Sequence, residues 1–135
     1  MIVQDFRDLI IRPTLAALGM GGAAAENLLL GTALVESGFR HLRQVRGPAL
    51  GLYQCEPATY ADILAYVRAR PGLLARLRPL IVGAELPDVS QIIWNLQYAT
   101  AICRLHYWKR HYNTVHGRGT VEKYLQCARS LTAGV

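Results

Sequence analysis

Apolar side chains recur at intervals of three and four residues along most of this chain, and glycine or proline interrupts each run. This spacing gathers apolar residues on one face of a helix, whereas a half-buried strand needs strict alternation. No segment shows a convincing strand pattern. The sequence therefore predicts an all-α protein, with a long irregular loop or a small hairpin between residues 39 and 56.

The breaks in this periodicity predict where each helix begins and ends. The first helix carries Phe6, Leu9 and Ile10, is kinked or restarted at Pro13 and ends in the glycines that follow Leu18. Further helices are expected at 23–37, with Gly38 as the stop, and at 57–70, 73–81 and from Thr120 onward. A loop is expected from Asn113 to Gly119, and the helix at 57–70 has an apolar side made of Tyr60, Ile63, Leu64 and Val67.

A long helix is expected from its cap at Asp88 or Ser90 to about His111. Two of its faces are apolar: one carries Ile92, Leu96, Ala99, Cys103 and Tyr107, and the other carries Trp94, Tyr98, Leu105 and Trp108. A helix apolar on most of its sides is typically a buried central helix.

The size and charge of the chain limit its organisation and its partners. Its 135 residues are 52% hydrophobic, enough for one core and too few for two ordinary domains, so we expect residues 1–135 to form one domain. The formal net charge of +6 suits an anionic partner such as nucleic acid, a membrane surface or the bacterial cell wall. Charge alone does not separate these partners from a simple contribution to solubility.

Cysteine and histidine positions argue against a metal or disulfide framework. The three cysteines, Cys55, Cys103 and Cys127, are odd in number and form no Cys-x-x-Cys pair. His106, His111 and His116 are spaced by five residues, which points them in different directions on a helix. We therefore expect no metal and no cofactor.

Neither a targeting segment nor a membrane span is expected from the sequence. The first five residues contain Asp5 and no basic side chain, unlike a secretory signal. The most apolar window, 14–35, is interrupted by Glu26, Asn27 and several glycines, whereas a span needs about 20 consecutive apolar residues.

Glu36 is the residue whose local sequence suggests acid catalysis. It lies near the C-terminal end of an apolar helix, where the helix dipole disfavours a carboxylate. Apolar neighbours such as Val35, Phe39, Leu50 and Leu52 would oppose its charge further, and both effects favour the protonated form that a general acid needs. A solvated glutamate at a frayed helix end would show the same local sequence, and this simpler interpretation stays open.

Three ordered blocks carry a family resemblance. They are Glu-Ser-Gly-Phe at 36–39, Gly-Leu-Tyr-Gln at 51–54 followed by Pro-Ala-Thr at 57–59, and His-Tyr-Asn at 111–113. Together they resemble the soluble lytic transglycosylases of the lysozyme-like superfamily, and the sequence from Gly47 to Gln54 resembles that of phage-encoded members. Asn95-Leu96 is similar to the Asn-Ile pair that opens a helix in that family. The resemblance covers roughly residues 26–125.

This resemblance implies a lysozyme-like helical domain that cleaves the β-1,4 bond between N-acetylmuramic acid and N-acetylglucosamine in peptidoglycan. Glu36 would be the single catalytic acid, acting first as acid and then as base. The muramoyl 6-hydroxyl would attack within the substrate and leave a 1,6-anhydro end. The resemblance also implies a set of substrate-binding residues: Ser37, Gly51, Leu52, Tyr53, Gln54, Tyr112 and Asn113.

Some positions depart from the family pattern. Tyr53 stands where the family has methionine, and its ring would still be able to stack on a sugar. Glu56 replaces an apolar residue and brings a second carboxylate, either as the base of a water-using reaction or as a helix-start glutamate favoured by the dipole. We favour the second interpretation. Thr114 and Val115 stand where the family has glycine after its Tyr-Asn pair.

The partners implied by the resemblance are peptidoglycan glycan strands and other phage tail or ejection proteins. The expected location is the phage particle or the host periplasm after delivery. An alternative is a virion structural or ejection protein with a lysozyme-like fold and little or no activity. A third, weaker interpretation is a helical nucleic-acid binder, based on the net charge and on the basic run Arg40, Arg43 and Arg46.

Overall fold

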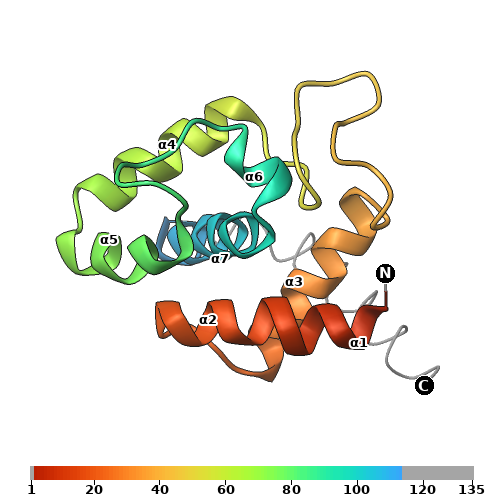
Figure 1. The fold of residues 1–135 in the computed structure, drawn as a ribbon, viewed down its shortest axis with the longest axis horizontal. Coiled ribbons are helices and arrows are strands. Elements are labelled where there is room, and N and C mark those ends of the chain that lie inside the picture. The colour runs from red at the N-terminus through yellow and green to blue at the C-terminus, as the bar shows by residue number, and fades with distance from the viewer. Residues whose placement is uncertain (1, 114–135) are drawn as a thin grey trace.

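The computed structural model describes residues 2–113, with side chains described as far as Arg110. Helices form all of the regular secondary structure in this part of the chain, so the all-α prediction is confirmed (Figure 1). The elements are α1 Val3–Phe6, the π turn η1 Arg7–Ile11, α2 Arg12–Leu18, α3 Ala23–Glu36, α4 Pro57–Arg68, α5 Pro71–Leu77, the 3₁₀ turn η2 Arg78–Leu80, α6 Gln91–Trp94 and α7 Leu96–Asn113.

The first three elements form one helical rod along one side of the molecule (Figure 1). The irregularity predicted at Pro13 takes the form of the π turn η1, which ends two residues before Pro13 and whose wider winding accommodates a residue without an N–H. Gly19 ends α2 in the left-handed conformation, with a φ of 69°.

Helix α3 ends one residue before the predicted boundary, and Gly38 provides the expected stop. The Gly38 N–H donates to the carbonyl oxygens of Ala33 at 3.1 Å and Leu34 at 2.9 Å, while its φ of 60° turns the chain out of the helix. Glu36 is therefore the last residue of α3. The residues after it form a loop that returns to α4.

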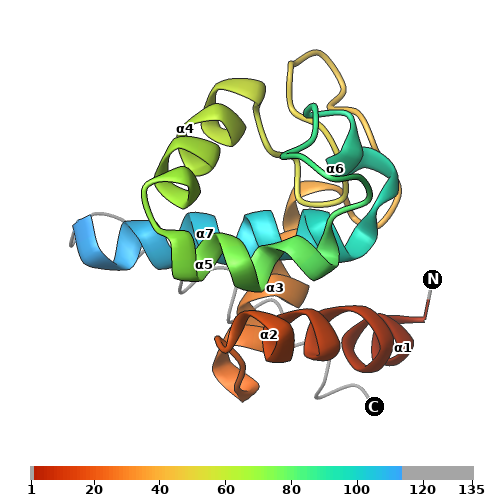
Figure 2. The ribbon, with the colours of Figure 1, turned by 60° about the vertical axis from the view of Figure 1, so that its left-hand side comes forward.

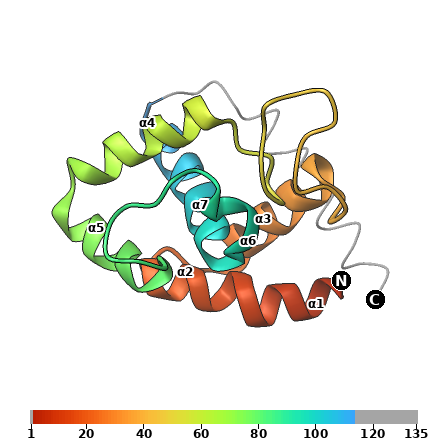
Figure 3. The same ribbon diagram turned by 45° about the horizontal axis from the view of Figure 1, so that its top comes forward.

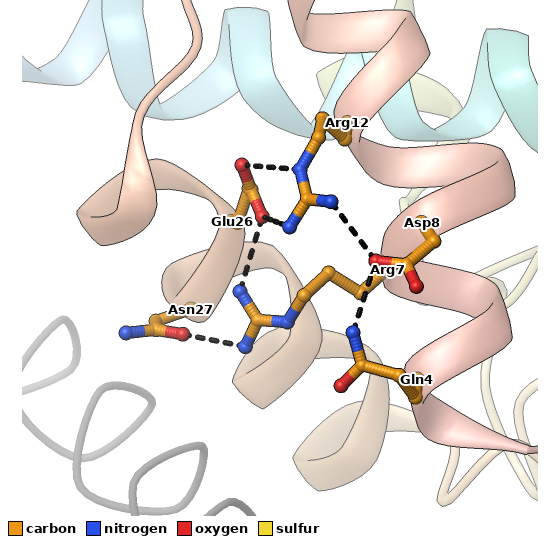
Figure 4. A network of polar contacts seen from close by, with 6 residues as sticks. All are labelled: Gln4, Arg7, Asp8, Arg12, Glu26 and Asn27. Carbon is orange, nitrogen blue, oxygen red and sulfur yellow. Dashed lines mark hydrogen bonds and ion pairs between the residues drawn. The ribbon is translucent and has the colours of Figure 1, made fainter.

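Buried polar contacts fix the opposite end of α3 to the helical rod (Figure 4). Arg7 donates to Glu26 at 3.2 Å and to Asn27 at 2.6 Å, and Arg12 donates to both Glu26 carboxylate oxygens at 3.0 and 3.2 Å. Burial by itself raises the pKa of Glu26, but the hydrogen bonds and charges of Arg12 and Arg7 outweigh it and lower the pKa. The network therefore holds an ionised carboxylate between the rod and α3.

The predicted long helix from Asp88 or Ser90 to His111 is wrong at one point, because Asn95 divides it into α6 and α7. The Asn95 side-chain oxygen accepts a hydrogen bond from the Tyr98 N–H at 3.0 Å, which caps α7. Its amide nitrogen donates to the Leu80 carbonyl at 2.9 Å. Asp88 instead accepts from the Ser90 N–H at 2.9 Å in the turn before α6.

Helix α7 is the central helix, as its apolar sides predicted. It contacts α4 and η2 as well as α2 and α3, and it runs through the middle of the fold (Figure 2). Its Tyr98, Ile102 and Leu105 are fully buried. Trp94 was assigned to an apolar face of this helix but is 58% exposed, because it lies at the end of α6, ahead of the break.

Candidate functional site

The loop between α3 and α4 folds back on itself through a tight turn at residues 51–54. Leu50 and Cys55 exchange two backbone hydrogen bonds of 2.9 Å across this turn. The hairpin that the sequence left open is thus reduced, in the described residues, to isolated bridges between Arg43 and Leu50 and between Leu50 and Cys55.

Gly51 presses this turn against α6. Its φ is 78°, and a Cβ added there would lie 2.6 Å from the backbone carbonyl oxygen of Ile92. Both the conformation and the close approach therefore require glycine. Gln54 completes the turn with a φ of 51°, an uncommon conformation for a residue with a side chain.

A pocket of about 220 Å³ lies between this turn, the end of α3, the start of α4 and one face of α7. Leu50, Ile92, Ala99 and Ile102 are among the apolar side chains that line it. The polar or titratable lining comes from Thr32, Glu36, Tyr53, Gln54, Cys55, Glu56, Thr59, Cys103, His106, Tyr107 and Arg110.

Glu36 lines this pocket from the end of α3, and its side chain is exposed. The expected apolar enclosure of Glu36 is therefore wrong. Leu50 does line the pocket, but Leu52 is buried in the core and Phe39 packs edge-on against Phe6 at 5.2 Å between ring centroids. Glu36 therefore belongs to the wall of an open pocket that Gln54 and Glu56 also line.

Gln54 is held in the pocket wall by its own turn. Its side-chain nitrogen donates to the Gly51 carbonyl at 2.9 Å and to the His41 carbonyl at 3.4 Å. These contacts orient the amide beside the cavity that Glu36 also lines. The structure thus brings together the glutamate of the first sequence block and the glutamine of the second.

Other residues of these two blocks are turned inward and position the loop. The Ser37 hydroxyl, in a side chain only 4% exposed, donates to the Ala33 carbonyl at 2.9 Å and accepts from the Phe39 N–H at 3.2 Å. Gly51 and Leu52 are buried, and neither lines the pocket. Any contribution of these three residues to a binding site is therefore through the backbone and its placement.

Tyr53 borders the pocket but is only 6% exposed. Its hydroxyl shares a 2.8 Å hydrogen bond with Thr100, and its ring lies 6.4 Å from that of Phe6. Burial raises the pKa of Tyr53 well above its usual value. The ring is a wall of the pocket and offers little face for stacking on a sugar.

Helix α7 supplies pocket residues that sequence reasoning did not assign to the site. His106, Tyr107 and Arg110 line the cavity opposite the loop, and the Tyr107 hydroxyl lies 2.8 Å from that of Thr32 on α3. Burial, followed by the charges of Arg110 and Lys109, lowers the pKa of His106. The only sequence signal for these residues was the apolar face of α7 with Ala99, Cys103 and Tyr107. Such a face predicts core and not part of a pocket.

The third sequence block falls at the end of the described chain. Asn113 was expected to begin a loop, but α7 continues through Asn113. The side chains of Tyr112 and Asn113 lie outside the described residues, as do Cys127 and the helix expected from Thr120.

The two described cysteines are free, and both thiols are poor nucleophiles. Burial, with a smaller effect from Glu56, raises the pKa of Cys55 to about 11. Burial also raises the pKa of Cys103, which is nearly inaccessible. No group of three or more potential metal ligands occurs within the described part of the chain.

The pocket therefore offers two carboxylates, a side-chain amide, a histidine that favours its neutral form, and an arginine. This combination suits proton transfer on a polar substrate that carries hydroxyl, amide or carboxylate groups. Among residues 2–113, no helix is long and apolar enough to cross a membrane. Comparisons with protein-family models, curated proteins and solved structures find no match to this chain.

Proposed function

We propose that this protein cleaves the glycan strands of bacterial peptidoglycan at the bond between N-acetylmuramic acid and N-acetylglucosamine, with Glu36 as the proton donor. The observation that carries the proposal is the shared pocket of Glu36 and Gln54, which belong to separate sequence blocks of the resemblance. A donor carboxyl and an amide that can hold an N-acetyl group are the minimum that such a site requires.

In this mechanism the Glu36 carboxyl group protonates the glycosidic oxygen, and the bond from that oxygen to C1 of the muramoyl sugar breaks. The N-acetylglucosamine side leaves with a new hydroxyl group. If the muramoyl 6-hydroxyl then attacks C1, its proton returns to the Glu36 carboxylate and a 1,6-anhydro end forms. The side chain of Gln54 would orient the sugar during both steps.

Glu56 provides an alternative second step. It lines the same pocket as Glu36, and its side chain makes no capping hydrogen bond to α4 within the described chain. Glu56 is the N-cap residue of α4, which is the helix-start position, favoured by the dipole, that the sequence predicted for it. With Glu56 as base, a water molecule would attack C1 and lose its proton to that carboxylate, which gives a reducing end as in inverting glycosidases.

The test is cleavage of purified peptidoglycan by the wild-type protein and by Glu36→Gln. Loss of a general acid slows such reactions by about 100-fold or more, so the variant should lose nearly all activity. Glu85→Gln is the matched control, because Glu85 is an exposed glutamate that does not line the pocket. Equal cleavage by wild type and Glu36→Gln would refute the assignment.

The second candidate function is that of a virion ejection or structural protein with little activity. For both functions the proposed location is the phage particle or the host periplasm. The exposure of Glu36 favours the second candidate, because an exposed carboxyl group does not give a bound substrate surroundings that exclude water. A stoichiometric amount in purified particles, together with no cleavage by the wild-type protein, would support this function over the first.

A further inference from the structure

Residues 40–46, called the basic loop here, combine positive charge with exposed apolar side chains. Arg40, Arg43 and Arg46 are all exposed, and the chain contains no acidic residue between Ser37 and Cys55. Between these arginines, Leu42 is 45% exposed and Val45 is 66% exposed. A solvated basic loop needs no such apolar side chains at its surface.

Hydrogen bonds hold the basic loop in a defined shape. The Gln44 N–H donates to the Ala49 carbonyl at 2.8 Å, and the Gln44 side chain accepts from the Ala49 N–H at 3.1 Å. The Gly51 N–H donates to the Leu42 carbonyl at 2.8 Å, which ties the loop to the turn that bears Gln54. The loop stands out from the helices beside the end of α3 and the start of α4 (Figure 3). Its apolar side chains are thus presented outward from a fixed backbone.

We infer that the basic loop docks the protein on an anionic phospholipid bilayer. The arginines would bind lipid phosphates, and Leu42 and Val45 would enter the boundary between headgroups and acyl chains. Guanidinium groups pair well with phosphate oxygens, and an apolar side chain gains from leaving water only where the partner has an apolar layer. Glycan and nucleic-acid backbones offer the charge or the polarity but no such layer, so the two exposed apolar residues favour the bilayer.

Docking by this loop would also determine how far the pocket lies from the membrane surface. The His41 carbonyl accepts a hydrogen bond from the Gln54 side chain, so the basic loop and the pocket wall are directly connected. A protein held on the bilayer by the basic loop would act on substrate close to the membrane surface. The docking itself uses neither Glu36 nor the proposed glycan cleavage.

The test is flotation of the protein with vesicles of phosphatidylcholine containing phosphatidylglycerol, compared with vesicles of phosphatidylcholine alone. The wild-type protein should bind the anionic vesicles and lose binding at high salt. Each basic side chain near such a surface contributes about a fivefold factor in binding, so Arg40, Arg43 and Arg46 all changed to glutamine should lower it about 100-fold. Leu42→Ser with Val45→Ser should also lower it, at unchanged charge.

Matched controls separate the loop from general charge and hydrophobicity. Three other exposed arginines, Arg68 at the end of α4, Arg70 just before α5 and Arg78 in η2, should tolerate change to glutamine with little loss of binding. Ile2→Ser with Val82→Ser removes two other exposed apolar side chains and should also have little effect. Circular dichroism checks that each variant is folded.

Three results would overturn the docking proposal: no binding of the wild-type protein to anionic vesicles, equal loss in loop and control variants, or loop-dependent retention on peptidoglycan or DNA without retention on vesicles. Glu36→Gln should bind vesicles like the wild type. A failure of glycan cleavage and a failure of docking are therefore distinguishable.

Discussion

Replacement of Glu26 by glutamine tests whether the polar network in Figure 4 stabilises the fold. Glu26 is 7% exposed and accepts hydrogen bonds from both Arg7 and Arg12. Glutamine has nearly the same shape but removes the charge, so the buried Arg7 loses its compensating anion. Removing one partner of a fully buried ion pair costs about 3–5 kcal/mol in free energy of unfolding.

Two features of the network reduce this cost. The Arg12 side chain is about half exposed and water can solvate it, and Arg7 keeps its 2.6 Å hydrogen bond to Asn27. We therefore expect a loss of about 2–3 kcal/mol for Glu26→Gln at pH 7, measured by urea denaturation. Asp5→Asn, an exposed carboxylate on the same helical rod, is the matched control and should change stability little.

The loss should depend on pH in a defined direction. The arginines lower the pKa of Glu26 in the folded protein below its ordinary value of 4.5. Its contribution to stability is therefore present above that ordinary value and disappears as the pH falls through the lower folded value. The difference between wild type and Glu26→Gln should shrink below about pH 4. A difference that stays constant from pH 7 to pH 3, or one under about 0.5 kcal/mol at pH 7, would refute this reasoning.

The turn that bears Gln54 and the amide itself give two further predictions. Gly51→Ala should lower the free energy of unfolding by about 2 kcal/mol or more, because the new Cβ meets the Ile92 carbonyl and the φ at this position is positive. The control is Gly72→Ala in α5, which has open space around it. This change should leave the free energy of unfolding unchanged or raise it slightly in the same urea titration. Equal effects of the two changes would contradict the packing of the turn on α6. Gln54→Asn keeps an amide that tolerates the left-handed conformation but shortens its reach, so kcat/KM on peptidoglycan should fall about tenfold or more with little change in melting temperature. Unchanged kinetics would remove Gln54 from the substrate contacts.

Local sequence signals predicted most of the helices because their ends are fixed by local chemistry. Helix α3 stops at Gly38 because glycine readily adopts the left-handed conformation, and this stop needs no contact with a distant part of the chain. The apolar face of α4, with Tyr60, Ile63, Leu64 and Val67, is buried as its spacing predicted. Such signals require no knowledge of what packs against the helix.

The break at Asn95 was missed because its cause is tertiary. The apolar periodicity continues through this position, but the Asn95 amide binds the Leu80 carbonyl from a distant segment. The chain therefore leaves the helix and starts a new one, with the same side chain as its cap. The pair Asn95-Leu96 is similar to a helix-opening pair, but the apolar spacing placed it inside one long predicted helix.

The residues of the candidate site were predictable only where short stretches of sequence carry them. Glu36 and Gln54 could be selected because two short blocks carry them, and both line one pocket together with Glu56, which the sequence favoured as a helix-start glutamate. His106 and Arg110 could not, since their exposure to the cavity depends on how α7 packs against α3 and the loop. The inward orientation of Ser37 and the openness around Glu36 likewise depend on packing that sequence spacing does not determine.

The most direct test of the central claim is mass spectrometry of the products released from purified peptidoglycan. The account predicts fragments cut between N-acetylmuramic acid and N-acetylglucosamine from the wild-type protein, with a 1,6-anhydro or a reducing muramoyl end that differ by one water. Glu36→Gln should release them at least about 100-fold more slowly. No such fragments from the wild-type protein, or the same amount from the variant, would contradict the proposed role of Glu36.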